Sequence, residues 1–368
     1  MSAASVLVVN AGSTSLKLRL LGPQDELVAS RDLSAGEPWE AGLEAFLDSS
    51  PQPDAAGHRV VHGGTEHSAP ALIDAELESR LHELEELAPL HNPAAVRAIR
   101  DLRRLRPDLP SVACFDTAFH CDLPAAASTY AVPAAWAERW PLRRFGFHGL
   151  SHAYCASRTA SLLGRRPSDL RIVSAHLGAG ASLAAVAGGR SVDTTMGFTP
   201  LDGLVMASRP GSVDPGLLLW VERHGELGPD SVEHALETES GLLGISGRSG
   251  DMRELEGAAA SGDERAALAI EVYLHRLRAS IAAMAAAMEG LDALAFTGGV
   301  GEGSTTIRSR ACEGLEFLEV IIDPSRNESG EQSDRLLSAD DSKPILVVHS
   351  REDLEIASQV RSVLRSPR

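Results

Sequence analysis

The feature that most constrains the fold is a short pattern that the chain contains twice. An apolar strand, a turn of small residues and a second strand occur at residues 5–21 and again from residue 171 onward. The first turn reads Gly-Ser-Thr-Ser-Leu (12–16), and the second reads Gly-Ala-Gly-Ala-Ser-Leu (178–183). Each is typical of a β-hairpin, in which a tight turn joins two antiparallel strands. The similarity is either a chance likeness of two turns or an internal duplication, and a duplication predicts two similar domains.

The rest of the chain alternates strands with helices, which favours an α/β fold. Apolar periodicity predicts helices over residues 74–90, 92–106 and 263–289. Further strands are predicted at 57–64, 111–120 and 343–353, and irregular loops at 134–147, 297–304 and 324–342. With 368 residues, the chain is long enough for two domains that each bury a core. We therefore predict two similar α/β domains around a cleft.

Composition excludes several classes of function. The chain has 34 Lys and Arg against 51 Asp and Glu, a net charge of −17, which argues against nucleic acid but leaves room for a small anion held by local arginines. It has no run of eighteen apolar residues, so no membrane span is expected, and the first residues are expected to begin a strand and not a signal peptide. Its four cysteines are scattered, which indicates a reducing cytosol without disulfides or a zinc site.

Lysine and asparagine are rare, and this makes one segment stand out. The chain contains two lysines, Lys17 and Lys343, and three asparagines, Asn10, Asn92 and Asn327. A coding bias explains the rarity, but NAGSTSLK (10–17) is the segment that holds both residue types. Its small residues let backbone N–H groups approach an anion, and its lysine supplies a charge. The segment is either a plain hairpin turn or a phosphate loop, and the rare residues favour the phosphate loop.

Two more glycine-rich turns and several strand-end side chains are candidate site elements. HLGAGAS (176–182) and TGGVGEGS (297–304) follow apolar strands, where nucleotides bind in open α/β sheets. Arg59 and Arg209 could bind a carboxylate or phosphate through two parallel hydrogen bonds. Asp116, Asp251 and Glu352 are candidate acids, and His148 in FGFHGLSH is a polar group on an apolar wall. Taken singly, each is more often structural, and the arginines between 97 and 106 are expected to be solvated.

Together these segments resemble one family, the acetate/propionate kinases of the acetate and sugar kinase, heat-shock ATPase and actin superfamily. The matching segments, in the family's order, are VNAGSTSLK, GHRVVHGG, LAPLHNP, FDTAFH, RRFGFHGLSH, HLGAGAS, TTMGFTPLDGLVMASRPGSVDPG, SGDMRE, FTGGVGEGS and REDLEIA. They span residues 6–357, essentially the whole chain. The resemblance implies two actin-like, ribonuclease H-like domains around a nucleotide cleft. Residues 1–147 with 354–368 would form the acyl substrate side, and 148–353 the nucleotide side.

The resemblance also implies an activity and partners. The expected reaction is reversible phosphoryl transfer from ATP to acetate, directly and in line, giving acetyl phosphate and ADP. The expected cofactor is Mg²⁺, with Mn²⁺ as a substitute. The expected state is a cytoplasmic homodimer with no nucleic-acid or membrane partner.

The family's site residues carry over position by position. The catalytic residues would be Asp116, His148 and Arg209. The acyl substrate would contact Arg59 and a small apolar pocket formed by Val61, Leu90, Phe147 and Pro200. The nucleotide would contact Lys17, His176, Leu177, Gly178, Ala179, Gly180, Asp251, Met252, Arg253, Gly299, Val300, Gly301, Glu302 and Gly303. Asn10 and Glu352 would lie beside the metal.

The chain departs from the family pattern at three of these segments. The family usually has Asn where this chain has Ala179 and Gly303, which leaves nucleotide preference open. Pro210 replaces the usual residue after Arg209 and could shift that side chain. Two alternatives remain open: a propionate or butyrate kinase of the same family, and a non-catalytic actin-like scaffold that binds nucleotide. The scaffold would need neither Arg59 nor an acyl pocket.

Overall fold

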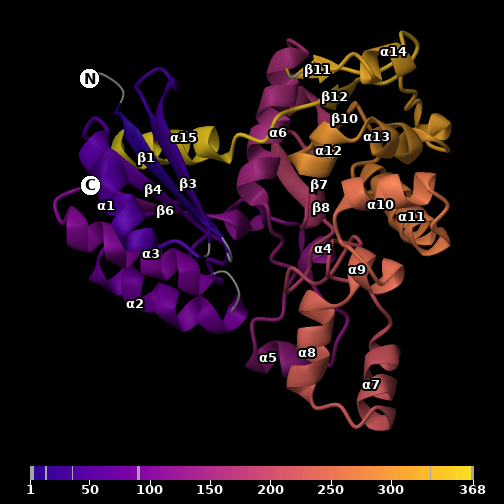
Figure 1. The fold of residues 1–368 in the computed structure, drawn as a ribbon, viewed down its shortest axis with the longest axis horizontal. Helices are drawn as coiled ribbons and strands as arrows, with labels where there is room; N and C mark the ends of the chain where they lie inside the picture. The colour runs from indigo at the N-terminus through magenta and orange to yellow at the C-terminus, as the bar shows by residue number, and fades with distance from the viewer. Residues whose placement is uncertain (1–3, 13–14, 35, 89–91, 332, 366–368) are drawn as a thin grey trace. The chain divides into compact units, whose positions relative to one another are not determined.

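The computed structural model describes residues 4–12, 15–34, 36–88, 92–331 and 333–365. The chain divides into two compact units. The first is made of Met1–Cys121, Phe147–Tyr154 and Arg351–Arg368, and the second of Asp122–Gly146 and Cys155–Ser350. Each unit has its own mixed β-sheet with helices packed on it, as predicted for an α/β chain of this length (Figure 1).

The first unit is built on a six-stranded sheet with the order β3-β2-β1-β4-β6-β5. Its strands are β1 (Val6–Ala11), β2 (Ser15–Leu21), β3 (Leu27–Ser34), β4 (Ala55–Val60), β5 (Ala71–Leu72) and β6 (Ser111–Phe115). β1, β4 and β6 run parallel, whereas β2 and β3 continue from β1 as antiparallel strands. The helices are α1 (Trp39–Ser49), α2 (Ala75–Glu83), α3 (Asn92–Leu105) and α15 (Glu352–Arg365), with the 3-10 helices η1 (Leu84–Leu87) and η2 (Asp116–His120).

The alternation of side chains along β1 supplies two separate cores. Leu7 and Val9 join a buried cluster with α1 and α3, and Val6 and Val8 join another with α15. Figure 1 shows α15 on one side of this sheet and α1 and α3 on the other. A strand buried on both faces reads as a continuous apolar run, as this one does. Each such side chain contributes about 1.5–3 kcal/mol by leaving water.

The second unit is built on a sheet with the order β11-β12-β10-β7-β8-β9. Its strands are β7 (Arg171–Leu177), β8 (Ala181–Ala187), β9 (Arg190–Thr194), β10 (Ala293–Thr297), β11 (Arg335–Leu336) and β12 (Ile345–Val347). Its helices are α4 (Ala125–Ser128), α5 (Ala134–Arg139), α7 (Pro215–His224), α8 (Pro229–Thr238), α9 (Gly241–Ser246), α10 (Met252–Ala260), α11 (Glu264–Ala287), α12 (Gly298–Gly303), α13 (Thr305–Cys312) and α14 (Pro324–Asn327), with the 3-10 helices η3 (Pro167–Asp169) and η4 (Glu316–Leu318). α6 (Gly149–Leu162) begins in the first unit and continues into the second.

The two sheets have the same topology. Read from its other edge, the second sheet is β9-β8-β7-β10-β12-β11, which matches β3-β2-β1-β4-β6-β5 strand for strand. β7, β10 and β12 run parallel, as β1, β4 and β6 do, and β8 and β9 continue from β7 as antiparallel strands. The two similar turns noted in the sequence join β1 to β2 and β7 to β8, so they occupy equivalent places. The duplication is therefore present in the fold.

Some predicted loops contain regular structure. The segment 297–304 was predicted as a loop, but most of it is α12, in which the Glu302 carboxylate accepts a hydrogen bond from the N–H of Gly298 at 2.9 Å. The loops 134–147 and 324–342 likewise contain α5, α14 and β11. The single helix predicted over 74–90 is α2 followed by η1, and the carbonyl of Leu84 at this junction accepts from the side chain of Asn92. In the part of the chain that the structure describes, no helix has the length and apolar character needed to cross a membrane.

Candidate active site

Four predicted site residues of the first unit meet at one edge of its sheet. Asn10 lies near the carboxyl end of β1, Arg59 near that of β4, and Asp116 follows β6 directly. Because these strands are parallel, their carboxyl ends share an edge, the usual place for ligands in α/β sheets. Glu352, at the start of α15, completes what we call the acid–arginine cluster.

The acid–arginine cluster is joined by hydrogen bonds. The Arg59 guanidinium donates from Nη2 and Nε to Asp116 Oδ2, at 2.6 and 3.1 Å. Its Nη1 lies 3.4 Å from Asn10 Oδ1, and its Nε lies 3.9 Å from Glu352 Oε2. Asn10 Nδ2 donates to the same Glu352 oxygen at 2.9 Å. One guanidinium thus holds two carboxylates and an amide in place.

Burial and charge act against each other in this cluster. Burial alone would lower the pKa of Arg59. The nearby Asp116 and Glu352 carboxylates have the larger effect and raise this pKa, so Arg59 stays protonated. Burial also raises the pKa of Asp116, whose side chain is fully buried, and Glu352 adds to this while Arg59 opposes it. Asp116 Oδ1 is buried and has no hydrogen-bond partner among the described residues. A buried polar atom without a partner is uncommon in folded proteins, and one explanation is a catalytic role.

The start of α6 brings His148 close to Asp116. His148 has a φ of 55°, in the left-handed region that is unusual for a residue with a side chain and recurs at functional sites. Gly149 follows, and a Cβ there would lie 1.9 Å from the backbone oxygen of Asp116, so only glycine fits. The backbone N–H of Leu150 adds a contact that favours the charged form of the Asp116 carboxyl. The FHGL sequence therefore fixes where the helix begins relative to this acid.

The predicted apolar residues of the first unit are buried near a group of histidines. Phe147 and Val61 are 2% and 5% exposed. The Phe147 ring packs edge-on against His62 at 5.6 Å, and its carbonyl lies 3.1 Å from His120 Nε2. Leu90, the third predicted member of the pocket, lies outside the described residues.

The NAGSTSLK segment joins β1 to β2, and its two rare residues are neighbours. Lys17 is paired in register with Asn10 on β1 and with Asp32 on β3, so the three lie in one row across the sheet. Lys17 is exposed, and its charge helps to lower the pKa of Asp32, for which the main cause is the hydrogen bond from Arg19. Ser13 and Thr14 at the turn lie outside the described residues.

In the second unit, most predicted nucleotide residues surround one cavity of about 400 Å³. It lies beside the turns that follow β7 and β10, whose carboxyl ends share an edge because these strands are parallel. The predicted residues that line it are Gly178, Ala179, Asp251, Met252, Arg253, Gly299, Val300 and Gly303. His176 and Leu177 end β7, Gly180 lies in the turn after it, and Gly301 and Glu302 belong to α12.

Asp251 and Glu302 hold the backbone around this cavity. Asp251 caps α10: its carboxylate accepts from the Arg253 N–H and guanidinium, both at 2.8 Å, and the guanidinium is the main cause that lowers the pKa of Asp251 to about 2. Besides the N–H of Gly298, Glu302 accepts from the N–H of Ser350 at 2.9 Å. The carboxylates of Asp251 and Glu302 thus accept hydrogen bonds from backbone N–H groups. Glycines and apolar side chains remain to contact a ligand in the cavity.

Arg209 lies on a loop that is tied to the first of these glycine-rich turns. The N–H of Ala207 donates to the carbonyl of Ala179 at 3.0 Å. Arg209 Nη1 donates to the Pro200 carbonyl at 3.1 Å, and its Nε lies 4.0 Å from Glu237. Burial lowers the pKa of Arg209, and Glu237 only partly offsets this. A largely buried cation whose burial is only partly offset by one carboxylate favours an anionic ligand.

Sequence reasoning missed several residues at these places. Glu237 on α8 and Glu256 on α10 lie in helices whose acids read as solvated, and Tyr273 is one apolar position of a long helix. The Leu150 N–H carries no side-chain signal at all. The short distance in sequence from His148 to Gly149 and Leu150 does not by itself indicate the contact with Asp116.

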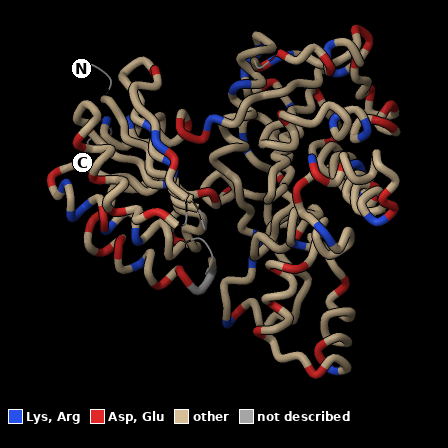
Figure 2. Tube along the Cα trace, in the orientation of Figure 1, with Lys and Arg blue, Asp and Glu red and all other residues tan. Residues whose placement is uncertain are grey.

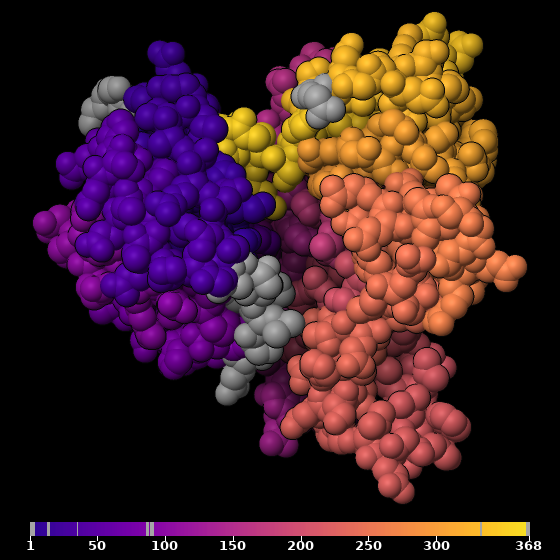
Figure 3. Space-filling view, viewed as in Figure 1, coloured from indigo at the N-terminus to yellow at the C-terminus, as the bar shows by residue number. Residues whose placement is uncertain are grey.

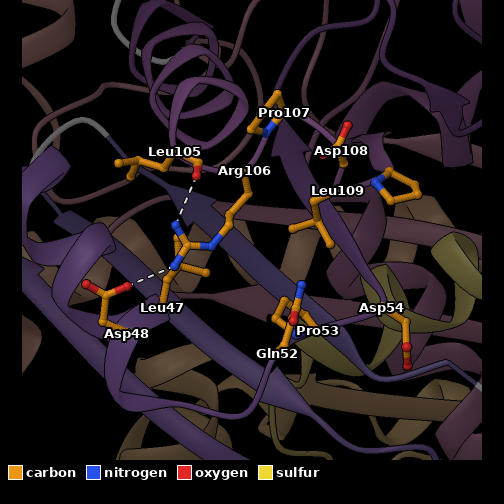
Figure 4. A pocket seen from close by; sticks show the side chains of 11 residues that line it. Leu47, Asp48, Gln52, Pro53, Asp54, Leu105, Arg106, Pro107, Asp108 and Leu109 are labelled. Carbon is orange, nitrogen blue, oxygen red and sulfur yellow. Dashed lines mark hydrogen bonds and ion pairs between the residues drawn. The ribbon is translucent and has the colours of Figure 1, made fainter.

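A second cavity lies elsewhere in the first unit (Figure 4). It measures about 510 Å³ and is next to Asp54 and Pro110, just before β4 and β6 begin, so it is at the opposite edge of the sheet from the acid–arginine cluster. Arg106 reaches across it to Asp48 at 2.8 Å. None of the predicted site residues lines it.

These features define a class: a phosphotransferase-like α/β protein with a duplicated mixed sheet, glycine-rich turns around a cavity in one unit and an acid–arginine cluster in the other. The model of the acetokinase family matches residues 41–358, and the chain belongs to that family. It is a kinase that transfers a phosphoryl group to a carboxyl group.

Known relatives agree along the whole chain. An acetate kinase from a Synechococcus species is 43% identical over an alignment of 402 positions, gaps included, that covers 98% of this chain and 99% of that protein. The crystal structure of Porphyromonas gingivalis acetate kinase matches with a TM-score of 0.90 at 35% identity, covering 99% of this chain and 100% of that one. The crystal structure of a propionate kinase from Francisella tularensis matches with a TM-score of 0.89 at 35% identity, covering 98% and 99%. The predicted actin-like, two-domain fold is confirmed.

Proposed function

We propose that this chain catalyses the reversible transfer of a phosphoryl group from ATP to acetate, giving acetyl phosphate and ADP. The observation that carries the proposal is the acid–arginine cluster, in which the Arg59 guanidinium is held by Asp116. Such a guanidinium matches the geometry of a small carboxylate. The family supplies the phosphoryl donor, and the cavity of the second unit offers it a place. We accordingly assign the acyl substrate to the first unit and the nucleotide to the second.

For this reaction the protein must place the acetate oxygen in line with the γ-phosphorus and stabilise the negative charge of the transferring phosphoryl group. An acetate oxygen attacks the γ-phosphorus, the bond from that phosphorus to the β-bridging oxygen breaks, and ADP leaves with the electron pair. Because acetate is ionised at neutral pH, no proton must be removed, and Asp116 is proposed to orient Arg59 and the substrate. The transition state is loose, with charge on three equatorial oxygens. Arg59, Arg209 and His148 would stabilise that charge.

The proposed metal, Mg²⁺ or Mn²⁺, fits the donors beside Arg59. Asn10 and Glu352 offer an amide and a carboxylate oxygen, joined to each other at 2.9 Å. Among the described residues no group of three or more His, Cys, Asp or Glu could hold a metal ion. This suits Mg²⁺, which takes most of its ligands from water and substrate phosphates. When bound, it would neutralise phosphate charge, and Lys17 in the neighbouring strand would add to this.

Propionate is the second candidate substrate, because one similar structure is a propionate kinase. The proposed acyl pocket includes Val61 and Phe147, both buried side chains of the first unit. One methylene changes the free energy of binding in such a pocket by only about 1–3 kcal/mol. We therefore propose that acetate is preferred and that propionate is also used.

We also propose that the active form is a homodimer in the cytoplasm. Apolar side chains on α5 and α7 are unusually exposed: Trp136 is 51%, Leu217 51% and Trp220 58% exposed. Figure 3 shows α7 and α8 at the surface of the second unit. Large exposed apolar residues support a protein interface. The four free cysteine thiols agree with a reducing compartment.

The test is an assay of acyl phosphate formation by the purified chain, trapping the product with hydroxylamine. ATP and Mg²⁺ would be supplied with acetate, propionate or butyrate, and kcat/KM measured for each acid. We expect acyl phosphate with acetate at the highest kcat/KM, less with propionate and least with butyrate. If none of the three acids gives product while ATP still binds, the proposal is wrong. That result would favour the non-catalytic scaffold that binds nucleotide.

A further inference from the structure

The cavity of the second unit combines apolar walls with one acidic edge. Leu242, Met252, Tyr273 and Val300 line it as apolar surfaces, the kind of surroundings that a flat aromatic base prefers. Glu256, from the second turn of α10, lines the same cavity. Neither the sequence motifs nor the proposed reaction uses this carboxylate.

The Glu256 carboxylate is held in one orientation. Ser304 Oγ donates to Glu256 Oε1 at 2.7 Å. Ser304 is itself fixed, because it caps α13 by accepting from the N–H of Ile307 at 3.0 Å. The Glu256 Oε2 atom has no hydrogen-bond partner among the described residues. A carboxylate fixed on one side and free on the other is prepared to accept hydrogen bonds from a ligand.

The other side chains around the cavity are paired with each other or have few polar atoms, so Glu256 is the side chain placed to distinguish one base from another. Asp251 and Arg253 are paired with each other at 2.8 Å. Gly303 and Ala179 offer no polar side chain, and a Cβ built at Gly303 would meet nothing within 4 Å, so the space beside it is open. Tyr273 carries a buried hydroxyl that has no partner among the described residues, so a ligand atom that reached it would gain a hydrogen bond.

We propose that Glu256 reads the nucleobase of the phosphoryl donor and favours guanine over adenine. An ionised carboxylate only accepts hydrogen bonds. Guanine presents two adjacent donors, N1–H and the N2 amino group, which match the two carboxylate oxygens. Adenine presents one donor, the N6 amino group, beside the lone pair of N1, which a carboxylate repels. The inference rests on the proposed function and specifies the donor: a guanine nucleotide serves better than ATP.

The test compares donors in the purified full-length enzyme at saturating acetate. For the natural chain we expect kcat/KM with GTP to exceed that with ATP. ITP, which keeps N1–H but lacks the N2 amino group, should fall between them. Glu256→Gln keeps the size but places an amide donor at one oxygen. It should lower kcat/KM for GTP by about tenfold or more, the loss of a hydrogen bond to a charged group, and leave ATP nearly unchanged.

The matched control is Glu254→Gln, on the exposed face of the same helix and outside the cavity. It removes the same charge and should leave the GTP/ATP ratio unchanged. Ser304→Ala should reduce the ratio partly, because it releases the carboxylate. Circular dichroism and thermal melts show that each variant is folded.

Two results would overturn the inference. One is a GTP/ATP ratio that Glu256→Gln leaves unaltered. The other is an equal loss for both donors that disappears with 2′-deoxy nucleotides, which would place Glu256 at the ribose. If no donor yields acyl phosphate, the proposed function fails instead. Calorimetric binding of non-hydrolysable GTP and ATP analogues to the natural chain and to Glu256→Gln then still decides whether Glu256 selects the base.

Discussion

Arg59 shows how one side chain can serve both stability and chemistry. Its guanidinium lies 2.6 Å from Asp116, which is fully buried, and 3.9 Å from Glu352. Arg59→Ala should therefore lower kcat by about 100- to 1,000-fold. It should also lower the free energy of unfolding by about 3–5 kcal/mol, because it leaves a buried carboxylate without its cation. Arg59→Lys should recover part of kcat, since it restores charge without the planar fork.

The two effects can be separated with a double variant. Replacing both members of a buried ion pair with apolar residues often restores stability. Arg59→Met combined with Asp116→Leu should unfold in urea close to the natural chain yet remain inactive. Steady-state kinetics at saturating acetate and urea unfolding give both quantities. A double variant with natural kcat would show that the pair is structural only.

Some residues of the candidate site can be predicted from the sequence, and others cannot. Asn10, Arg59 and Asp116 follow apolar strands, and parallel strands bring their carboxyl ends together, so these residues could be predicted to meet. Glu237 and Glu256 lie on helices where an acid usually faces water. Their positions depend on which helix covers which loop, and no local pattern fixes that.

At the scale of elements, the start of α6 controls the surroundings of Asp116. A Cβ on Gly149 would approach the Asp116 carbonyl oxygen to 1.9 Å, so Gly149→Ala must move either the helix or the strand end. We expect a loss of about 1–3 kcal/mol in the free energy of unfolding, the usual range for overpacking, together with a lower kcat. Urea unfolding and steady-state kinetics measure the two effects.

Gly257→Ala is the matched control for that substitution. Gly257 lies inside α10, and a Cβ there meets nothing within 4 Å. Alanine should raise the free energy of unfolding by about 0.5–1 kcal/mol, because glycine is the poorer helix former. If Gly149→Ala behaved like Gly257→Ala, with unchanged kcat, the helix start would not position Asp116.

Elements with strong periodicity could be predicted, and those held by long-range contacts could not. α3 and α11 lie within a residue or two of their predicted ranges. α12 was missed because glycines disfavour helices, and here Glu302 fixes the turn through the N–H groups of Gly298 and Ser350. Figure 2 shows acidic and basic residues mixed along α2 and α3, where Arg100 and Arg103 pair with Glu78 at 2.9 and 2.8 Å. The expected solvated arginine cluster is therefore partly an ion-pair network on the surface.

At the scale of the whole molecule, the duplication explains why one sheet pattern carries two kinds of site. Both sheets end their parallel strands at one edge. In the first unit this edge carries Asn10, Arg59 and Asp116, and in the second it carries glycine-rich turns. The same topology thus supports a charged cluster in one copy and a permissive backbone in the other. From the sequence, the similarity of the two turns could be a chance likeness or a duplication, and the matching strand orders show the duplication.

The molecule as a whole should lose stability in mild acid through three buried histidines of the first unit. Burial lowers the pKa of His58 to about 3, and that of His62 and His120 to about 4. Their ordinary value is about 6.5. The unfolded chain therefore binds these protons at a higher pH than the folded chain does. Stability is complete above pH 6.5 and falls as the pH drops toward 4.

Each histidine should lower the free energy of unfolding by about 2 kcal/mol between pH 7 and pH 5. The figure follows from about 1.36 kcal/mol per pH unit below the ordinary pKa of about 6.5. His58 is the clearest test, because neither of its ring nitrogens has a hydrogen-bond partner among the described residues. His58→Leu keeps the core apolar and removes one titrating group. The free energy of unfolding of this variant in urea should therefore fall by about 2 kcal/mol less than that of the natural chain between pH 7 and pH 5. If His58→Leu and the natural chain lose the same free energy between pH 7 and pH 5, His58 does not drive the acid sensitivity.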